Sequence, residues 1–367
     1  MWIPPALAAI LALSPGVSAQ QASGDMTPGH KPIVIAHRGA SALRPEHTLE
    51  AYAKGIADGA DFIEPDLVMT RDGVLIARHD NALGDTTDVT AHAAFAQRRT
   101  VREIDGETVT DWFSEDFTLA EIRQLRARER LPQMRGTAHD GRHAVPTLAE
   151  IIALVERESN ARGRMIGLIP EIKHSSHFHA RGLDPEQALA AAIDEHAYAR
   201  RAPFGIQSFE VGNLRQLRTL LRPHRNVFLV QLVGMPDDVP VDRALTGDRT
   251  HTHASMLTPA GLRAIAAYAH VVALSSRAVL PIDADGALAA PTRLVADAHA
   301  AGLEVHVWTL RPENRFLPPA LRCGDDLDAR CEPGAIAEAR AFAAAGVDAV
   351  FVDDPALARR AFGEPSR

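Results

Sequence analysis

The sequence predicts an α/β protein with the (β/α)8 fold, a TIM barrel, and two observations favour it. First, short apolar segments alternate with alanine-rich stretches of helical pattern along the chain. Second, eight such segments occur, covering residues 33–36, 62–69, 165–172, 204–209, 227–233, 271–275, 304–310 and 349–354. Eight alternations fit a closed barrel better than an open doubly wound sheet, because no glycine-rich dinucleotide-binding motif follows any of these strands.

The stretches between the strands are typical of helices. Examples are TLEAYAKGIADG, ALAAAIDEHAY, NLRQLRTLL, LRAIAAYA, RLVADAHAAG and AIAEARAFAAAG. Some of them end in glycine, the usual residue just after a helix C-terminus. The helical stretches therefore support the alternation that the strands indicate.

A ninth apolar segment, VLIAR, breaks the alternation. It follows the second strand after only four residues, which is too short for a crossover helix and indicates an antiparallel hairpin. A type I′ turn at Asp72-Gly73 would pair Asp66 with His79, whereas a turn at Arg71-Asp72 would pair Glu64 with His79. In either register we expect His79 beside the two carboxylates, because directly opposed residues share a face.

We expect residues 33–362 to form a single barrel domain. Between residues 80 and 146 the alternation is lost, and the sequence is charged and irregular apart from one helix-like segment, TLAEIRQLRARE. Long stretches without regular pattern are usually functional in compact domains. We interpret residues 80–146 as an insertion over the C-terminal mouth of the barrel.

The N-terminus has the pattern of an export signal. Residues 6–13 are an apolar core, and residues 17–19 form a small-x-small cleavage site before Gln20. The usual basic residues before the core are missing, which a misassigned start codon would explain. A buried N-terminal helix is disfavoured by the prolines at positions 4, 5 and 15. The prediction is a signal peptide over residues 1–19, a linker over 20–32, and a periplasmic or secreted protein.

The two cysteines, Cys323 and Cys331, flank the polar, turn-rich stretch GDDLDAR. In an exported protein, a pair this close would form a disulfide that closes a surface loop. Two free thiols are the alternative. Neither cysteine has the surroundings of a catalytic nucleophile.

Composition excludes two classes of partner. The formal net charge of −8 argues against nucleic acid, because binding to the phosphate backbone needs a basic face. No apolar run reaches the roughly 18 residues that a membrane span requires. We therefore expect small-molecule substrates, while the sequence leaves the oligomeric state open.

Ionisable and polar residues end several of the predicted strands. In a barrel these ends meet at the catalytic mouth, where we expect nine side chains to converge. They are His37 and Arg38, Glu64 and Asp66, Glu171 and Lys173, Gln207, Trp308 and, through the hairpin, His79. Each motif alone is weak, since a Glu-x-Asp can be a solvated strand end and Glu-Ile-Lys an ion pair. Their placement at successive strand ends favours a site.

Three buried carboxylates repel one another, and a divalent cation is the simplest resolution. Oxygen ligands favour a hard ion, which we predict to be Ca²⁺ rather than Mg²⁺. Arg38 and Lys173 then remain to hold an anion, and the fork of arginine suits phosphate. His37 and His79 would serve as general acid and base. Together these features indicate cleavage of a phosphate ester. The later HSSHFH stretch has poor spacing for a second metal site.

Several of these motifs resemble those of the glycerophosphodiester phosphodiesterases, particularly the longer periplasmic or secreted bacterial type. The similar segments are AHRGASALRPEHTLEAYAKGIADGADFIEPDLVMTRDGVLIARHD, PEIKHSSHFHARG, IQSFE, VHVWTLRPEN and GVDAVFVDDP. They extend over about residues 33–362, and the first of them is highly specific. The HSSHFH stretch and the Cys323–Cys331 loop depart from the common pattern and leave the preferred alcohol open.

The resemblance implies a TIM barrel that hydrolyses glycerophosphodiesters to glycerol 3-phosphate and an alcohol. The roles that it implies are catalysis for His37 and His79, metal binding for Glu64, Asp66 and Glu171, and phosphate contact for Arg38 and Lys173. Gln207 and Trp308 are further candidates for the substrate site. The alternatives are a phospholipase of the D or C type and a non-catalytic phosphodiester-binding protein. The second alternative gives no reason for an acid/base pair of histidines.

Overall fold

The computed structural model describes residues 31–363, so the predicted signal peptide and nearly all of the predicted linker lie outside the described residues. The central sheet closes into a parallel barrel, because β1 pairs with both β13 and β2, and β9 pairs with β10. This confirms the predicted fold. The barrel strands are β1 (Ile33–His37), β2 (Phe62–Glu64), β3 (Asp66–Met69), β7 (Gly167–Leu168), β8 (Glu171–Ile172), β9 (Phe204–Ser208), β10 (Val227–Val233), β11 (Val271–Ser275), β12 (Glu304–Leu310) and β13 (Ala349–Val352).

Prolines interrupt the second and third predicted strands. Pro65 separates β2 from β3, and Pro170 separates β7 from β8. Proline has no N–H to donate to a sheet ladder, so pairing stops at these points and resumes one step later. Each interruption comes immediately before a carboxylate residue, Asp66 or Glu171.

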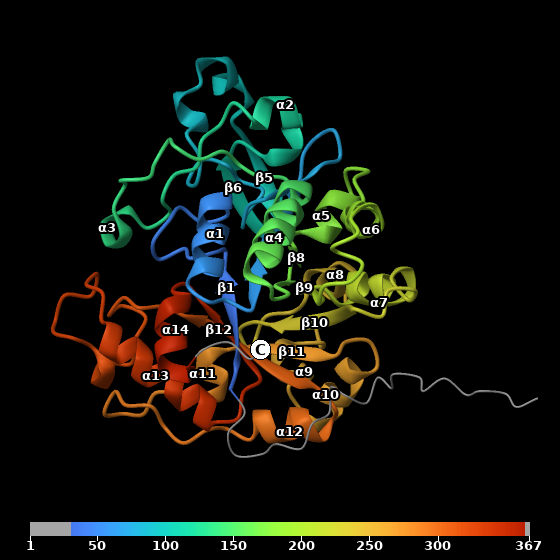
Figure 1. Cartoon of the computed structure of the whole chain (residues 1–367). Coiled ribbons are helices and arrows are strands. Elements are labelled where there is room, and N and C mark those ends of the chain that lie inside the picture. Colours follow the sequence, from blue (N-terminus) through green and yellow to red (C-terminus); the bar gives the residue numbers. More distant parts are fainter. Residues whose placement is uncertain (1–30, 364–367) are drawn as a thin grey trace, which may run out of the picture.

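Helices surround the barrel, as Figure 1 shows. Several begin with a threonine or aspartate whose side chain caps the first turn, for example Thr48 and Asp184. The helices outside the segment 80–146 are α1 (Leu49–Ala57), α4 (Leu148–Arg162), α5 (Ser175–His179), α6 (Pro185–Glu195), α7 (Val211–Leu220), α8 (Val241–Leu245), α9 (His253–Met256), α10 (Pro259–Ala266), α11 (Ser276–Val279), α12 (Leu294–Ala300), the 3₁₀ turn η5 (Pro319–Leu321), α13 (Glu332–Ala344) and α14 (Pro355–Phe362).

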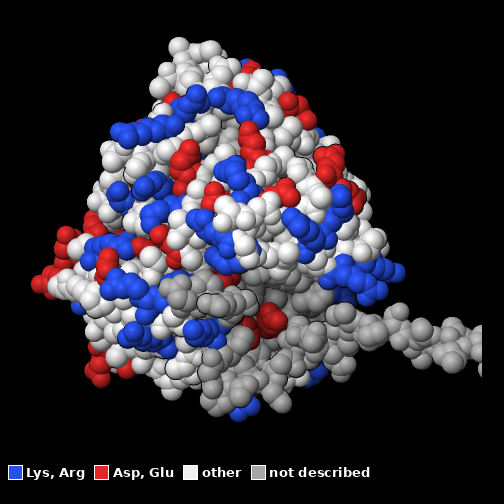
Figure 2. All heavy atoms as spheres, in the orientation of Figure 1, with Lys and Arg blue, Asp and Glu red and all other residues white. Residues whose placement is uncertain are grey.

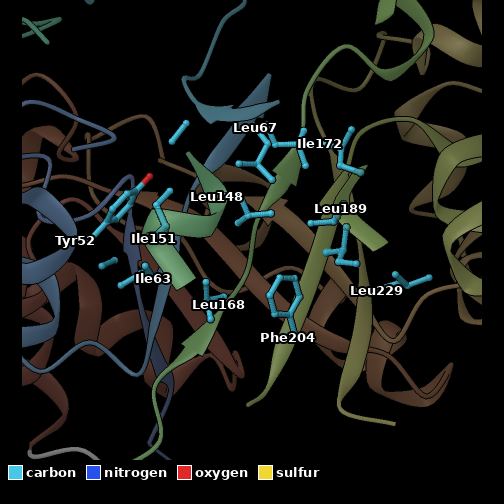
Figure 3. Packing of buried hydrophobic residues seen from close by; sticks show 14 of the residues in the cluster. Tyr52, Ile63, Leu67, Leu148, Ile151, Leu168, Ile172, Leu189, Phe204 and Leu229 are labelled. Atoms are coloured by element: carbon cyan, nitrogen blue, oxygen red, sulfur yellow. The ribbon is translucent and has the colours of Figure 1, made fainter. Parts of the chain in front are cut away.

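The hydrophobic core has two layers, separated by the wall of the barrel. The larger layer joins outward-facing strand residues such as Ile63, Leu168 and Phe204 to helix residues such as Ile151 and Leu189 (Figure 3). The smaller layer fills the barrel interior with Ile35, Ile169, Val230, Leu232, Val271, Ala273, Ala349 and Phe351. Because side chains alternate along a strand, residues two positions further along also face the interior. This rule places His37, Glu171 and Asp353 at the mouth of the barrel.

The hairpin after the second strand is present, but neither predicted register is right. Strand β4 (Leu75–Ala77) pairs antiparallel with β3 so that Met69 opposes Leu75. Three residues form the turn instead of two, and Gly73 takes a left-handed conformation with φ of 80°. The side chain of Thr70 stabilises this longer turn by accepting a hydrogen bond from the Val74 N–H at 3.0 Å. His79 therefore lies beyond the end of the ladder, and Arg78 takes the place opposite Asp66.

Residues 80–146 contribute no strand to the barrel, and they form the blue-green part at the top of Figure 1. Their elements are β5 (Thr100–Ile104) and β6 (Glu107–Asp111), which pair as a hairpin, η2 (Val89–Ala91), η3 (Ala93–Arg98), η4 (Ser114–Asp116), α2 (Leu119–Ile122) and α3 (Pro132–Arg135). The sequence pattern did not indicate the hairpin. The predicted helix is also shorter than its pattern, because the chain turns away after α2 and the Ala127 N–H donates to the carbonyl of His143.

Three further features of the described residues bear on the sequence predictions. Cys323 and Cys331 form a disulfide, as predicted. Basic and acidic side chains are interspersed on the face shown in Figure 2. No helix within residues 31–363 is long and apolar enough to cross a membrane.

Candidate active site at the mouth of the barrel

Three buried carboxylates come together where β2, β3 and β8 meet. Glu64, Asp66 and Glu171 each offer an oxygen atom, and these atoms lie within 4.8 Å of one another. The three residues are 2%, 1% and 7% exposed. Pairing of β3 with β8 sets Asp66 directly beside Glu171. The structure thus brings together the three residues that the sequence predicted as metal ligands.

The electrostatics of this cluster fit a divalent cation. Burial and the neighbouring charge of Asp66 raise the pKa of Glu64 well above its usual value. For the same two reasons the pKa of Glu171 rises to about 8, although Lys173 acts in the opposite direction. Burial alone would also raise the pKa of Asp66, but the hydrogen bond from His47 and the nearby charge of Lys173 together outweigh it and lower the pKa. The three carboxylates therefore still repel one another, and a divalent cation that binds oxygen ligands would relieve this repulsion.

Other buried side chains orient these carboxylates. Gln207 donates from Nε2 to Glu64 Oε1 at 3.1 Å and to the carbonyl of Ile169 at 3.0 Å. His47 Nε2 lies 2.9 Å from Asp66 Oδ2, while its Nδ1 lies 2.8 Å from the hydroxyl of Tyr52. With His47 neutral, Tyr52 donates to Nδ1 and Nε2 donates to Asp66. Gln207, predicted as a substrate-binding residue, thus contacts a predicted metal ligand.

Two cationic side chains flank the cluster. Arg38 Nη1 is 3.0 Å from Glu46 Oε2, and Arg38 Nε is 3.4 Å from Asp66 Oδ2. Lys173 Nζ lies 2.9 Å from Glu171 Oε1. Burial lowers the pKa of Lys173, but the carboxylates around it outweigh this effect and raise the pKa to about 12. Both groups therefore keep their charge at the mouth, where an anion would meet them.

Each predicted catalytic histidine is held by an aspartate through Nδ1. His37 Nδ1 lies 2.6 Å from Asp353 Oδ1, and His79 Nδ1 lies 2.8 Å from Asp80 Oδ1. A carboxylate on Nδ1 fixes the proton there and leaves Nε2 as the nitrogen that exchanges protons with a ligand. The side chain of His79 remains 31% exposed, so a ligand in solution reaches it.

The surroundings favour the neutral form of both rings. Burial and the charge of Arg38 lower the pKa of His37, against the effect of Asp353. Burial, Arg38 and Lys173 likewise lower the pKa of His79, against the effects of Asp80 and Asp66. The charges of Arg38 and Lys173 thus act on His79, although the predicted strand pairing does not hold. A bound anion would counter the two cations and favour protonation of a ring.

Aromatic side chains form one wall of the site. Phe209 lies under Lys173, whose Nζ is 5.8 Å from the ring centroid. Trp308 meets Phe209 edge to face with the ring centroids 6.0 Å apart, and its Nε1 donates to the carbonyl of Ala273 at 3.2 Å. Trp308 thus stands beside the cationic part of the site, where the sequence placed it.

The histidines of the HSSHFH stretch bind acidic partners. His174 Nδ1 contacts Asp105 at 2.6 Å, and His177 Nε2 contacts Glu115 at 2.7 Å. His179, Asp184 and Glu186 lie close enough to share an ion. However, Glu186 accepts hydrogen bonds from His179 at 2.7 Å and from Ser175 at 2.6 Å, and Asp184 caps α6. All three side chains thus have hydrogen-bond partners within the protein.

Sequence reasoning missed several residues that support the site. Asp353 and Asp80 carry the same strand-end signal as the predicted residues, since Asp353 follows β13 and Asp80 follows His79. Glu46 and His47 lie within the first family-like segment but carry no strand-end signal. Arg130 contacts Asp80, and Arg135 contacts Asp353. Both arginines lie in the irregular segment 80–146, where no pattern indicated them.

Comparison with known proteins places the chain in one family. The profile of the glycerophosphoryl diester phosphodiesterase family matches residues 37–357. A glycerophosphodiester phosphodiesterase of Arabidopsis thaliana is 34% identical over 300 residues, which are 78% of this chain and 76% of that protein. One from Treponema pallidum is 26% identical over 354 residues, covering 91% and 93% of the two chains.

Solved structures share the fold. A protein of Silicibacter pomeroyi is similar with a TM-score of 0.64 and 24% identity, over 92% of this chain and 94% of that one. An Oleispira antarctica phosphodiesterase, solved with its product sn-glycerol-3-phosphate, has a TM-score of 0.57 and 20% identity over 90% and 96% of the chains. These similarities establish the barrel. From the profile match and the similarity to the Arabidopsis enzyme, this chain belongs to the glycerophosphoryl diester phosphodiesterase family.

Proposed function

We propose that the mouth of this barrel hydrolyses glycerophosphodiesters to sn-glycerol 3-phosphate and an alcohol, with His37 and His79 as the proton-transfer pair. The reaction class follows from membership of the family. One observation carries the assignment of residues. Two histidines, each held by an aspartate through Nδ1, lie around three buried carboxylates that are flanked by Arg38 and Lys173. Binding alone would not require such a pair of histidines.

Glu64, Asp66 and Glu171 would hold the cation, which we propose to be Ca²⁺. When bound, a divalent cation polarises a phosphoryl oxygen and offsets the charge that develops on it. Calcium accepts oxygen ligands in flexible geometry, whereas magnesium demands a near-ideal octahedron. Ligands whose positions are set by two interrupted strands, as here, suit the more tolerant ion.

Arg38 and Lys173 would bind the anionic phosphodiester. Their charges are already partly offset by Glu46 and Glu171, so each side chain is held in place before a ligand arrives. Preorganised cations stabilise the charge that accumulates on phosphoryl oxygens during substitution without moving. Phe209 and Trp308 offer an apolar wall beside them for the carbon atoms of the substrate.

Proton transfer would use Nε2 of the two histidines. One ring accepts the proton of the attacking hydroxyl, either water or the 2-hydroxyl of the glycerol part, as its oxygen bonds to phosphorus. The bond from phosphorus to the alcohol oxygen breaks, and the other ring, protonated in the complex with the anion, gives its proton to that oxygen. Attack by the 2-hydroxyl would form a cyclic phosphodiester, which water then opens. Asp353 and Asp80 keep the two rings in the required tautomer.

We further propose that the mature protein is exported and begins at Gln20. The pattern of residues 1–19 and the disulfide between Cys323 and Cys331 support this localisation, because disulfides persist in oxidising compartments. The intact mass of the protein recovered from the periplasm or medium tests it. A mass that retains residues 1–19 would contradict the proposal.

The decisive assay for the activity is release of sn-glycerol 3-phosphate from glycerophosphocholine, with and without a chelator. We expect release that stops on chelation and returns when Ca²⁺ is added back. Release of phosphocholine or of a phosphatidyl product from lipid would favour a phospholipase. Tight binding of glycerophosphocholine without turnover would favour a binding protein.

A further inference from the structure

Two arginines of the segment 80–146 contact the aspartates that hold the two histidines. Arg130 Nη1 lies 3.0 Å from Asp80 Oδ2, and Arg135 Nη2 lies 2.6 Å from Asp353 Oδ2. In each aspartate, the other oxygen bonds Nδ1 of the histidine. The two arginines are five positions apart, on either side of the start of α3. One short stretch of chain therefore reaches both histidines through their carboxylates.

Arg135 is held from several sides. Its Nε lies 2.7 Å from Glu313 Oε1, and its Nη1 donates to the carbonyl of Ser41 at 2.9 Å. The side chain is only 6% exposed, so these contacts are shielded from water and salt. Arg311 Nε lies 3.1 Å from the same oxygen of Asp353. Asp353 therefore keeps an arginine on this oxygen if Arg135 is replaced. Arg311, however, is 28% exposed, whereas Arg135 is buried and fixed by Glu313 and Ser41, so Arg135 holds the carboxylate more rigidly.

Arg130 joins His79 to the phosphate-binding arginine. Its Nη2 lies 2.8 Å from Glu46 Oε1, and its Nε is 3.1 Å from both oxygens of Glu46. Glu46 in turn holds Arg38 at 3.0 Å. A continuous series of contacts thus runs from His79 through a hydrogen bond to Asp80, and through ion pairs from Asp80 to Arg130, Glu46 and Arg38. This series is more exposed than the contacts of Arg135, because the Arg130 side chain is 25% exposed.

We propose that residues 130–135 act as a clamp that positions both histidines, with Arg130 and Arg135 as positioning residues. The inference rests on the proposed function of the two rings. An aspartate side chain rotates about its last bond, and the histidine that it holds turns with it. An arginine on the outer oxygen stops this rotation, so the Nε2 atom stays in line for proton transfer.

The two arginines have different expected effects. Arg135 acts through Asp353 on His37 alone, so its loss lowers kcat and leaves KM nearly unchanged. Arg130 acts on His79 and, through Glu46, on Arg38, so its loss lowers kcat and raises KM for the anionic substrate. If residues 130–135 only attached the insertion to the barrel, loss of Arg130 and loss of Arg135 would not differ in their effects on kcat and KM.

The experiment compares Arg135→Met, Arg130→Met and the control Arg128→Met in the full mature chain with Ca²⁺ present. Arg128 lies in the same stretch, is half exposed, and lies 3.7 Å from Asp140, away from the histidines. With glycerophosphocholine, we expect a loss of kcat on the order of 10- to 100-fold for each of the first two variants. KM rises only for Arg130→Met. The control retains wild-type values.

A double-mutant cycle separates positioning from general stability. In the His37→Ala background, Arg135→Met should cost less than about twofold more, because the ring that it positions is gone. In the His79→Ala background, Arg135→Met should keep its full cost. Equal cost in both backgrounds would overturn the assignment of Arg135 to His37.

Two further measurements show whether a loss of activity comes from loss of folding. Thermal unfolding and Ca²⁺ titration by calorimetry show whether each variant retains the barrel and the metal site. If Arg135→Met does not fold, Arg135→Lys takes its place in the cycle. This variant should keep part of the wild-type kcat, because lysine keeps the charge but reaches only one carboxylate at a time. Wild-type kcat in folded Arg135→Met and Arg130→Met would defeat the clamp. An inactive wild-type chain would instead defeat the proposed function.

Discussion

The two halves of the barrel are built differently. In the first half, the strands are interrupted by Pro65 and Pro170, and their ends carry Glu64, Asp66 and Glu171. In the second half, β10 and β12 each run for seven residues without interruption. Interior positions of β10 and β11 are apolar, with Val230, Leu232, Val271 and Ala273 in the barrel core. The same fold thus has one half in which prolines interrupt the strands around the site and one half whose strands are continuous. In the second half, the pairing of β12 with β13 shifts its register between Val307 and Leu310.

The physical reason lies in the cost of buried charge. Three carboxylates at the mouth weaken the structure unless cations and donors surround them. The first half therefore also carries Arg38, His47, Lys173 and Gln207, which contact these carboxylates. The regular second half provides the packing that holds the closed shape. We expect substitutions among the charged residues of the first half to change the rate, and those of second-half residues away from the mouth to change the stability.

The largest effect is expected at the metal ligands. Glu64→Ala, Asp66→Ala and Glu171→Ala should each weaken Ca²⁺ binding and lower kcat/KM by about 1,000-fold or more, since a cation supplies several kcal/mol to the transition state. Calorimetric titration with Ca²⁺ and the phosphodiesterase assay measure the two effects. The control Glu304→Ala lies at the opposite end of the barrel, at the start of β12. Full activity after exhaustive chelation would refute the metal site.

Next in size is the loss of a proton-transfer group. His79→Ala should lower kcat about 10²- to 10⁴-fold with little change in KM. A nitrophenyl phosphodiester needs less protonation of its leaving group, so it should escape most of this defect if His79 is the acid. His37→Ala should then impair turnover of both substrates.

The opposite pattern would exchange the roles of the two rings. Equal rescue of both variants by the nitrophenyl substrate would contradict the acid/base assignment altogether. The matched comparison is His299→Ala, which removes a half-buried histidine paired with Asp348 at the other end of the barrel. Its kcat should equal that of the wild type.

A smaller effect is expected at the hairpin turn. Gly73 has φ of 80° with open space around it, so Gly73→Val meets strain rather than a clash. The strained turn should shift β4 and, beyond its end, His79, which lowers kcat several-fold while Ca²⁺ binding is kept. Gly302→Val is the matched control, because Gly302 also has a positive φ and open space but precedes β12. Both variants should lose similar stability, and only the first should lose activity.

The smallest effect on rate is expected at the disulfide. Replacing both Cys323 and Cys331 with serine removes a cross-link between two residues that lie eight positions apart in the second half of the barrel. The loss of stability should be about 2–3 kcal/mol by the chain-entropy estimate. Thermal unfolding with and without reductant measures it, and kcat should stay within about twofold of the wild type. A fall in kcat of much more than about twofold would show that this loop supports the site.

Periodicity and strand-end chemistry were enough to predict the barrel and most of the site. The eight strands lie where the apolar runs predict them, and several of these runs end in polar residues, because a barrel interior needs apolar side chains and its mouth does not. The rule that parallel strands of a barrel end on one face predicts that Glu64, Asp66 and Glu171 lie together, as they do in the structure. Asp353 also follows the end of a barrel strand, but it was not among the predicted site residues.

Other features depended on particular side-chain contacts, some local and some between distant parts of the chain, that no sequence pattern marks. The register of the β3–β4 hairpin was set by a hydrogen bond from the Val74 N–H to the side chain of Thr70, which the turn sequence alone did not reveal. Arg135 meets Asp353 across 218 positions of sequence. Arginines in an irregular segment look like any solvated residues, because local patterns report only neighbours within a few positions. Only the folded chain, which buries Arg135 against two carboxylates, distinguishes it from the exposed Arg128.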